Sequence, residues 1–126
     1  MKGCLDTWAV IGWSREEECA AAVSRCLVDG AVMSWISVGE VEYITSRKSG
    51  AERAAQLVES ISRNVVLDLA TPERVREAAA LKAVHRMSYA DCFAVATAVA
   101  HRLPLLTGDP EIVAVKVPGL RVVDLR

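Results

Sequence analysis

The sequence predicts a single α/β domain in which a mostly parallel sheet is covered by helices on both faces. The candidate strands are short, continuous apolar runs, as is typical of strands buried on both sides. Helical segments separate these strands, with only the last pair left open, and this alternation builds parallel sheets. No linker, repeat or low-complexity segment divides the 126 residues, a length that can bury one core.

The first half of the chain is expected to form strands over 2–6 and 31–35, and helices over 7–13, 16–29, 37–50 and 51–63. The first strand stops at an acid, Asp6. The alanine-rich helix ends at Gly30 and the following one at Gly50, because glycine favours the position just past a helix end. The helix that follows Gly50 is joined to its predecessor by a tight turn.

The second half is expected to form strands over 65–69, 104–108 and 120–125, and helices over 71–86 and 88–102. The clearest helix start in the chain is here. Thr71 is placed to cap the helix, Pro72 takes its first position and Glu73 lies in its first turn. A short break at Met87 separates the two helices.

Composition and charge exclude several classes of protein. Hydrophobic residues make up 52%, too many for a disordered chain, and this surplus suggests a surface that a partner covers. The net charge of -1 excludes a globally basic nucleic-acid binder but not a local basic patch. No apolar run reaches the roughly 18 to 20 residues of a membrane span. The N-terminus is a poor signal peptide, so we expect a cytoplasmic protein without membrane contact.

The four cysteines do not predict a metal site. Cys4, Cys19, Cys26 and Cys92 form no CxxC pair, and only two histidines could join them. A zinc site therefore has too few ligands at the usual spacing. We expect buried, reduced thiols that act as small hydrophobic side chains.

Four acids fall where ligands bind in open parallel sheets, at the carboxyl ends of strands. Asp6 closes the first strand, and Glu40 lies about one turn into the helix after the second. Asp109 lies just beyond the fourth strand, and Asp91 is in the first turn of the helix that leads to it. If that helix starts at the same edge, the four carboxylates converge there.

Helix capping explains each acid equally well when it is taken alone. The segments 37–40 and 88–91 match the capping box, in which an acid at the third helical position returns to the capping residue. Asp109 with Pro110 forms a good helix start, and Asp6 can cap the helix that follows it. Each acid also gains from the positive end of a helix dipole.

Taken together, the acids favour a metal site. Carboxylates that lie close together repel one another, and a divalent cation relieves that cost. Oxygen ligands without histidine suit Mg²⁺ or Mn²⁺ rather than zinc. Glu111 is near enough to Asp109 to support it or to add a ligand, whereas Asp68 and Asp124 have no helix start that would aim them at the cluster.

The segments "CLDTWAVIGW", "SWISVGEVEYI", "LKAVHRMSYADCFAVATA" and "LLTGDPE" resemble the successive motifs of PIN-domain ribonucleases. Within that family the resemblance is to the VapC toxins of toxin–antitoxin pairs, and it runs from residue 2 to about 125. It implies one PIN-like domain over 1–126, folded as a three-layer αβα sandwich. It also implies an endoribonuclease that depends on Mg²⁺ or Mn²⁺.

The resemblance also implies roles for individual residues. The family's acidic quartet corresponds to Asp6, Glu40, Asp91 and Asp109. We expect the three aspartates to hold the metal directly or through water, and Glu40 to complete the shell or orient the attacking water. The family's small hydroxyl residue before the final acid corresponds to Thr107, which we expect to orient a ligand or position a water. The family often has Asn or Ser where this chain has Trp8, which puts one local polar contact in doubt.

RNA and protein partners follow from the same resemblance. Candidate cations for the RNA backbone are Arg47, Lys48, Arg53, Lys82, His85 and Arg86. A solvated helix face explains each of them equally well, and His85 is given no catalytic role. The resemblance implies a homodimer and a cognate antitoxin that fills a groove near the acids. Possible partner surfaces are Trp8, Trp13, Trp35 and Ile44.

Two other functions remain open at this point. A PIN nuclease of RNA processing would carry the same acids without being a toxin. A receiver-like signalling domain would need a phospho-accepting acid after the third strand, which Asp68 could imitate, but it would also need paired acids after the first. A PIN-like domain used only for binding would be expected to lack part of the quartet. No GxGxxG or P-loop motif predicts a nucleotide-binding module.

Overall fold

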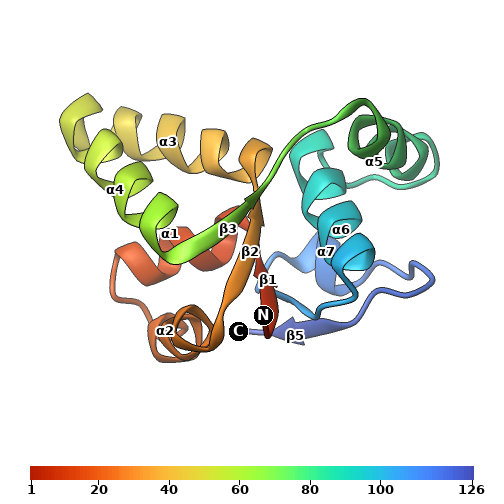
Figure 1. Ribbon diagram of the computed structural model, residues 1–126, viewed down its shortest axis with the longest axis horizontal. Coiled ribbons are helices and arrows are strands. Elements are labelled where there is room, and N and C mark those ends of the chain that lie inside the picture. The colour runs from red at the N-terminus through yellow and green to blue at the C-terminus, as the bar shows by residue number, and fades with distance from the viewer.

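The computed structural model describes all 126 residues and contains one five-stranded sheet, with every strand parallel to its neighbours (Figure 1). The strands are β1 (Gly3–Leu5), β2 (Ala31–Ser34), β3 (Val65–Asp68), β4 (Leu105–Thr107) and β5 (Val122–Asp124). The helices are α1 (Thr7–Ser14), α2 (Ala20–Asp29), α3 (Trp35–Ser49), α4 (Ala51–Asn64), α5 (Pro72–Val84), α6 (Tyr89–His101) and α7 (Pro110–Val113). None of the helices is long and apolar enough to cross a membrane.

Two helical layers enclose the sheet, which confirms the predicted sandwich. Figure 1 shows α1 to α4 on one side of the strands and α5 to α7 on the other. Alternate strand residues supply the two cores, because successive side chains point to opposite faces. Leu5, Met33 and Leu106 pack in the core under α1 to α4, and Cys4 and Val32 pack in the core under α5 to α7. All four cysteines are buried and free, as expected.

The strand order β3-β2-β1-β4-β5 places the first strand in the middle of the sheet. The chain runs outward through β2 and β3 on one side of β1, then returns to β4 and β5 on the other. The order therefore reverses between β1 and β4, at the kind of position where open α/β sheets bind ligands. Receiver domains have the order 2-1-3-4-5, so the receiver-like alternative is wrong.

Polar residues follow the apolar strands at the level where the sheet ends. Ser34 pairs in register with Asp68, and Thr107 with Asp124. The pairing of Cys4 with Val32 and with Leu105 then sets Asp6, two residues further on, between Ser34 and Thr107. The carboxyl edge thus carries a polar row across the whole sheet.

Several helix ends agree with the sequence predictions. Gly30 and Gly50 end α2 and α3 with φ of 102° and 92°, values that favour glycine. The Thr71 hydroxyl caps α5 by accepting a hydrogen bond from the amide of Arg74 at 3.2 Å. Pro72 is the first residue of that helix.

Two predicted helix starts are wrong. Trp35 begins α3 instead of ending a strand, because the Ser34 hydroxyl caps the helix by accepting from the Ile36 amide at 3.1 Å. Ser37 is therefore a buried residue inside α3, and the capping box proposed over 37–40 does not exist. The helix predicted from residue 16 begins only at Ala20, because Glu16 takes a positive φ of 55°.

The last two strands are also separated by a helix, since the short α7 follows Asp109. Sequence periodicity cannot detect a helix of 4 residues, although the Asp-Pro start signal was visible. Every connection in the sheet therefore includes a helix, as a parallel arrangement requires.

Candidate active site

A cleft of about 500 Å³ opens at the carboxyl edge of the sheet, close to the reversal in strand order. The carboxylates that line it are Asp6, Glu17, Glu40, Asp91, Asp109 and Glu111. The structure thus brings the predicted quartet and Glu111 together from four separate parts of the chain. Glu17 was not predicted, because it follows the positive φ of Glu16 in a turn that no sequence pattern indicates.

Asp6 is the most deeply buried of these acids, with 2% of its surface exposed. Its Oδ1 accepts a hydrogen bond from the amide of Ala9 at 2.8 Å, which makes it the cap of α1. Its Oδ2 accepts a hydrogen bond from the hydroxyl of Thr107. Both oxygens therefore have a protein donor, and the direction of the carboxylate is fixed by two elements.

Thr107 joins Asp6 to the segment that carries Asp109. Its fully buried hydroxyl donates to Asp6 and accepts from the amide of Asp109 at 3.0 Å. The Asp109 carboxylate in turn accepts from the amide of Glu111 at 2.9 Å and caps α7. A single hydroxyl thus sets the relative position of two acids from distant parts of the sequence.

Two helices bring the other members of the quartet to the cleft. The Ser88 hydroxyl caps α6 by accepting from the amide of Asp91 at 3.1 Å, which places Asp91 in the first turn. Glu40 comes from α3, and its Oε2 accepts a hydrogen bond from the hydroxyl of Tyr43 at 3.4 Å. Capping by the carboxylate and convergence on the cleft therefore coexist at Asp6 and Asp109, whereas α6 is capped by Ser88 and Asp91 follows in its first turn.

The electrostatics of the cleft disfavour a full set of bare negative charges. Burial raises the pKa of Asp6 to about 7, although the hydrogen bonds from Thr107 and Ala9 lower it, and the charges of Asp91 and Asp109 make smaller upward contributions. Burial also raises the pKa of Asp91 to about 6, aided by the charges of Asp109, Glu40 and Glu111. At neutral pH these carboxylates gain from protons or from a cation.

An apolar wall completes the cleft, formed by Trp8, Ile11 and Ile44. A Cβ added to Gly108 would lie 2.4 Å from Cη2 and Cζ2 of the Trp8 indole, closer than any real contact. Glycine is therefore required between Thr107 and Asp109, because the indole ring packs directly against the backbone there. Trp8 makes this packing contact at the position where the resemblance suggested a polar side chain.

The donors in the cleft fit a hard divalent cation. All of them are oxygens, and neither histidine nor cysteine lines the walls. The side chains are not gathered into a closed set of three metal ligands. Mg²⁺ commonly binds through one or two carboxylates and keeps several waters. An acidic cleft that is open to solvent therefore suits it.

The predicted cations lie in different surroundings. Arg47 stacks over the ring of Tyr43, with Cζ 5.0 Å from the centroid. Lys82 is engaged elsewhere, because its Nζ donates to the carbonyl of Met87 at 2.8 Å. Neither Lys82 nor Arg86 lines the acidic cleft, whereas Lys48 lines a small pocket nearby.

Asp68 belongs to a separate buried cluster that sequence analysis missed. It accepts from Nε and Nη2 of Arg74 at 2.8 and 3.1 Å, and its Oδ1 lies 2.8 Å from Nε2 of His101. Burial tends to raise the pKa of Asp68, but the hydrogen bonds from Arg74 and His101 bring it below the ordinary value. Because these partners lie 6 and 33 residues away, only the fold reveals the cluster.

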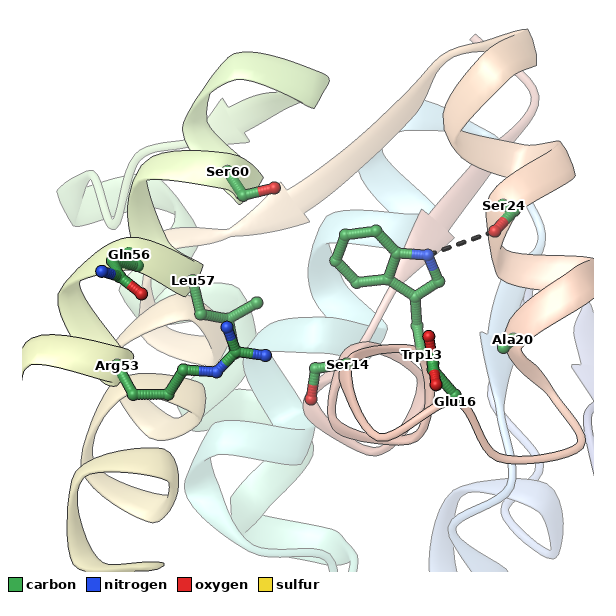
Figure 2. A pocket seen from close by; sticks show the side chains of 9 residues that line it. All are labelled: Trp13, Ser14, Glu16, Ala20, Ser24, Arg53, Gln56, Leu57 and Ser60. Atoms are coloured by element: carbon green, nitrogen blue, oxygen red, sulfur yellow. Dashed lines mark hydrogen bonds between the residues drawn. The ribbon is translucent and has the colours of Figure 1, made fainter. Parts of the chain in front are cut away.

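A second hollow, of about 390 Å³, lies between the α1–α2 connection and α4. Figure 2 shows Arg53 and Leu57 projecting from α4 toward Trp13, whose indole Nε1 donates to the hydroxyl of Ser24 at 3.2 Å. Among the other proposed partner surfaces, Trp8 and Ile44 lie in the acidic cleft and Trp35 is 39% exposed at the start of α3.

Comparisons with known proteins place this geometry in a family. The model of the PIN domain matches residues 3–118. The structure of DNA-bound VapBC from Salmonella typhimurium is similar with a TM-score of 0.79 and 17% identity, covering 100% of this chain and 99% of that chain. No curated relative matches in sequence.

Two further solved structures are similar to the whole chain or most of it. VapBC2 from Rickettsia felis, bound to a promoter DNA fragment, has a TM-score of 0.77 and 13% identity, covering 98% of both chains. VapC20 of Mycobacterium tuberculosis, a toxin that cleaves the sarcin-ricin loop, has a TM-score of 0.70 and 16% identity. That match covers 88% of this chain and 92% of the other.

Proposed function

The chain belongs to the PIN domain family, a family of nucleases, and on that premise we propose that it is a metal-dependent endoribonuclease. The observation that carries the proposal is the convergence of Asp6, Glu40, Asp91 and Asp109 on one cleft, although they span most of the chain. The ion it uses is Mg²⁺ or Mn²⁺, and its substrate is an RNA phosphodiester.

In this proposal Asp6, Asp91 and Asp109 hold the ion, directly or through water. When bound, Mg²⁺ or Mn²⁺ polarises a phosphodiester oxygen and lowers the pKa of a bound water. Thr107 keeps Asp6 and Asp109 in register through its two hydrogen bonds. Glu40 lines the same cleft from α3 and is assigned to orient the attacking water, with Glu111 in support.

We also propose that the nuclease is the toxin of a toxin–antitoxin pair. The relatives of similar fold include VapBC complexes, and one of them is a toxin that cleaves the sarcin-ricin loop. By this analogy the chain forms a homodimer and binds a cognate antitoxin. A PIN nuclease of RNA processing is the alternative, and it would not arrest growth.

Cleavage of total cellular RNA by the purified, partner-free protein tests the nuclease. We expect discrete fragments with Mg²⁺ or Mn²⁺, none with EDTA, and none from Asp91→Asn. Glu42→Gln is the matched control, because it removes an exposed acid of α3 that does not line the cleft. Equal cleavage by wild type and Asp91→Asn would contradict the proposal.

Expression without a partner separates the toxin from a nuclease of RNA processing. We expect wild-type protein to arrest growth and Asp91→Asn to permit it at the same level of folded protein. Normal growth with abundant folded wild-type protein would contradict the toxin assignment and leave the nuclease assignment standing.

A further inference from the structure

A small pocket of about 90 Å³ lies between the end of α1 and the α3–α4 hairpin. Its lining residues are Ser14, Arg15, Thr45, Lys48, Ser49, Arg53 and Leu57. Three of these side chains are cations and three are hydroxyls, and no carboxylate is among them. A lining of this kind is suited to an anion, because the cations supply charge and the hydroxyls of Thr45 and Ser49 can donate hydrogen bonds. The hydroxyl of Ser14 already donates to the carbonyl of Ile11 at 2.8 Å.

The three cations of this pocket have no partner within the chain. Arg15, Lys48 and Arg53 take part in no ion pair and in no side-chain hydrogen bond. Other cations of the molecule are engaged: Arg74, for example, is held by Asp68 and Glu77. Like charges from α3, α4 and the end of α1 therefore meet at one place, and an external anion would relieve their repulsion.

The pocket adjoins the acidic cleft and shares one lining residue with it. Arg15 lines both, and Ser14, Arg53 and Leu57 line both the pocket and the hollow of Figure 2. The cleft, the pocket and the hollow are therefore neighbours, and their order defines a path from the carboxylates, past the three cations, to Trp13.

The two ends of α1 set the scale of this path. Asp6 caps the start of the helix and Arg15 caps its end. A rise of 1.5 Å per residue separates these positions by roughly 13 Å. A phosphate bound in the pocket would therefore be a few nucleotides away from the scissile phosphate along a single strand.

We propose that the pocket of Arg15, Lys48 and Arg53 binds a backbone phosphate of the RNA a few nucleotides from the cleaved bond. The proposal rests on the nuclease function proposed above. It assigns Arg15 to RNA binding in addition to Lys48 and Arg53, and it places the same phosphate against all three side chains. The carboxylates of the cleft repel an RNA strand, so cations beside the cleft would hold the strand while the metal-binding acids receive the scissile phosphate.

The test is the triple variant Arg15→Gln/Lys48→Gln/Arg53→Gln beside the matched control Arg76→Gln/Lys116→Gln/Arg121→Gln. Both remove two arginines and one lysine, all exposed, and the control residues lie outside the cleft and the pocket. The measurement is kcat and KM for a single-stranded RNA containing a mapped cleavage site, over a series of KCl concentrations.

We expect the pocket variant to raise KM on the order of tenfold with kcat within about twofold of wild type. We also expect the slope of log(kcat/KM) against log[KCl] to shrink by about 0.7, which is the contribution of one neutralised phosphate on a single strand. The control should leave KM and slope unchanged. An unchanged KM and slope in the pocket variant would overturn the proposal.

Binding measurements keep this test separate from the nuclease test. Fluorescence anisotropy with the same RNA gives a salt slope for each variant even if no preparation cuts RNA. A slope reduced only in the pocket variant sustains the phosphate site, and equal slopes overturn it. If only the affinity for an acidic protein partner falls, the cations serve that partner and the RNA assignment is wrong.

Discussion

At the scale of single residues, the candidate site depends on hydrogen bonds from a buried residue that does not itself line the cleft. Thr107 is fully buried. Its one hydroxyl donates a hydrogen bond to the Asp6 carboxylate and accepts one from the backbone amide of Asp109. Removal of such a hydroxyl leaves buried polar groups without partners, which costs about 1–3 kcal/mol. The residue is therefore a positioning group for both acids.

The contact between Gly108 and the ring of Trp8 leads to a prediction. In Gly108→Ala the new Cβ would lie 2.4 Å from the indole, so the ring that lines the cleft or the segment that carries Asp109 must shift. We expect a loss of RNA cleavage of at least tenfold, because a misplacement of about 1 Å can cost a hundredfold in rate. Cleavage assays and thermal denaturation are the measurements.

The double variant Gly108→Ala/Trp8→Ala provides the control. Removing the ring removes the clash, so the double variant should recover activity relative to Gly108→Ala alone. Such coupling is expected for residues in direct contact. Strictly additive losses in Gly108→Ala, Trp8→Ala and the double variant would show that the indole does not restrict this loop.

At the scale of elements, helix starts explain why the sequence revealed so much of the site. Asp6, Asp91 and Asp109 lie at or near helix N-termini that sequence signals mark, and the same signals point to the carboxyl edge of the sheet. Among the helices that carry the quartet, only the start of α3 was misplaced, because Ser34 and Ser37 are both plausible caps three residues apart. Local sequence does not distinguish them, whereas the length of β2 does.

Elements that meet only in three dimensions could not be predicted. The cation pocket needs Arg15 at the end of α1 beside the α3–α4 hairpin, and the turn at Glu16 then redirects the chain. The Asp68 cluster joins β3, α5 and α6 through partners of very different sequence separation. Neither arrangement leaves a periodic pattern in the sequence.

The Asp68 cluster is expected to stabilise the fold without serving the reaction. Its carboxylate is 9% exposed and holds Arg74, which is 15% exposed. Asp68→Asn should lower the free energy of unfolding by about 2 kcal/mol, because it leaves the guanidinium with Glu77 as its only charge partner. The lowered pKa of Asp68 means that this contribution is present at neutral pH and is lost as the pH falls through the acid range.

Urea denaturation at pH 7 and pH 3 measures this effect, with RNA cleavage at 25 °C as the second readout. Folded Asp68→Asn should cut RNA like wild type. Loss of cleavage in a variant with unchanged stability would contradict the structural role and would place Asp68 in the active site.

At the scale of the whole molecule, the acidic cleft should make stability depend on pH in an unusual direction. The pKa of Asp6 rises from its ordinary 3.8 to about 7 on folding, so between these values the folded chain binds more protons than the unfolded one. Stability is therefore greatest below pH 4 as far as this group is concerned, and it falls as the pH rises toward 7. The contribution of Asp6 to the free energy of unfolding thus differs by on the order of 4 kcal/mol between pH 4 and pH 7.

Thermal denaturation from pH 5 to pH 8 tests this expectation in the presence of EDTA and of Mn²⁺. The melting temperature of wild type should fall with rising pH in EDTA, and Mn²⁺ should recover much of the loss, since a ligand of the folded state stabilises it. Asp6→Asn should flatten the profile in EDTA. If the melting temperature of wild type rose steadily from pH 5 to pH 8 without metal, the expectation that ionised Asp6 destabilises the folded chain would be contradicted.

The central place of β1 also has a consequence for the synthesis of the chain. β1 is translated first, but its neighbour β4 carries Thr107, which lies 101 residues after the Asp6 that it bonds. An unfinished chain on the ribosome thus has Asp6 but lacks both the hydroxyl that orients it and the acid at Asp109. If the protein cuts RNA as proposed, it would be harmless to the ribosome that makes it until the segment with Thr107 and Asp109 has been made and has paired with β1.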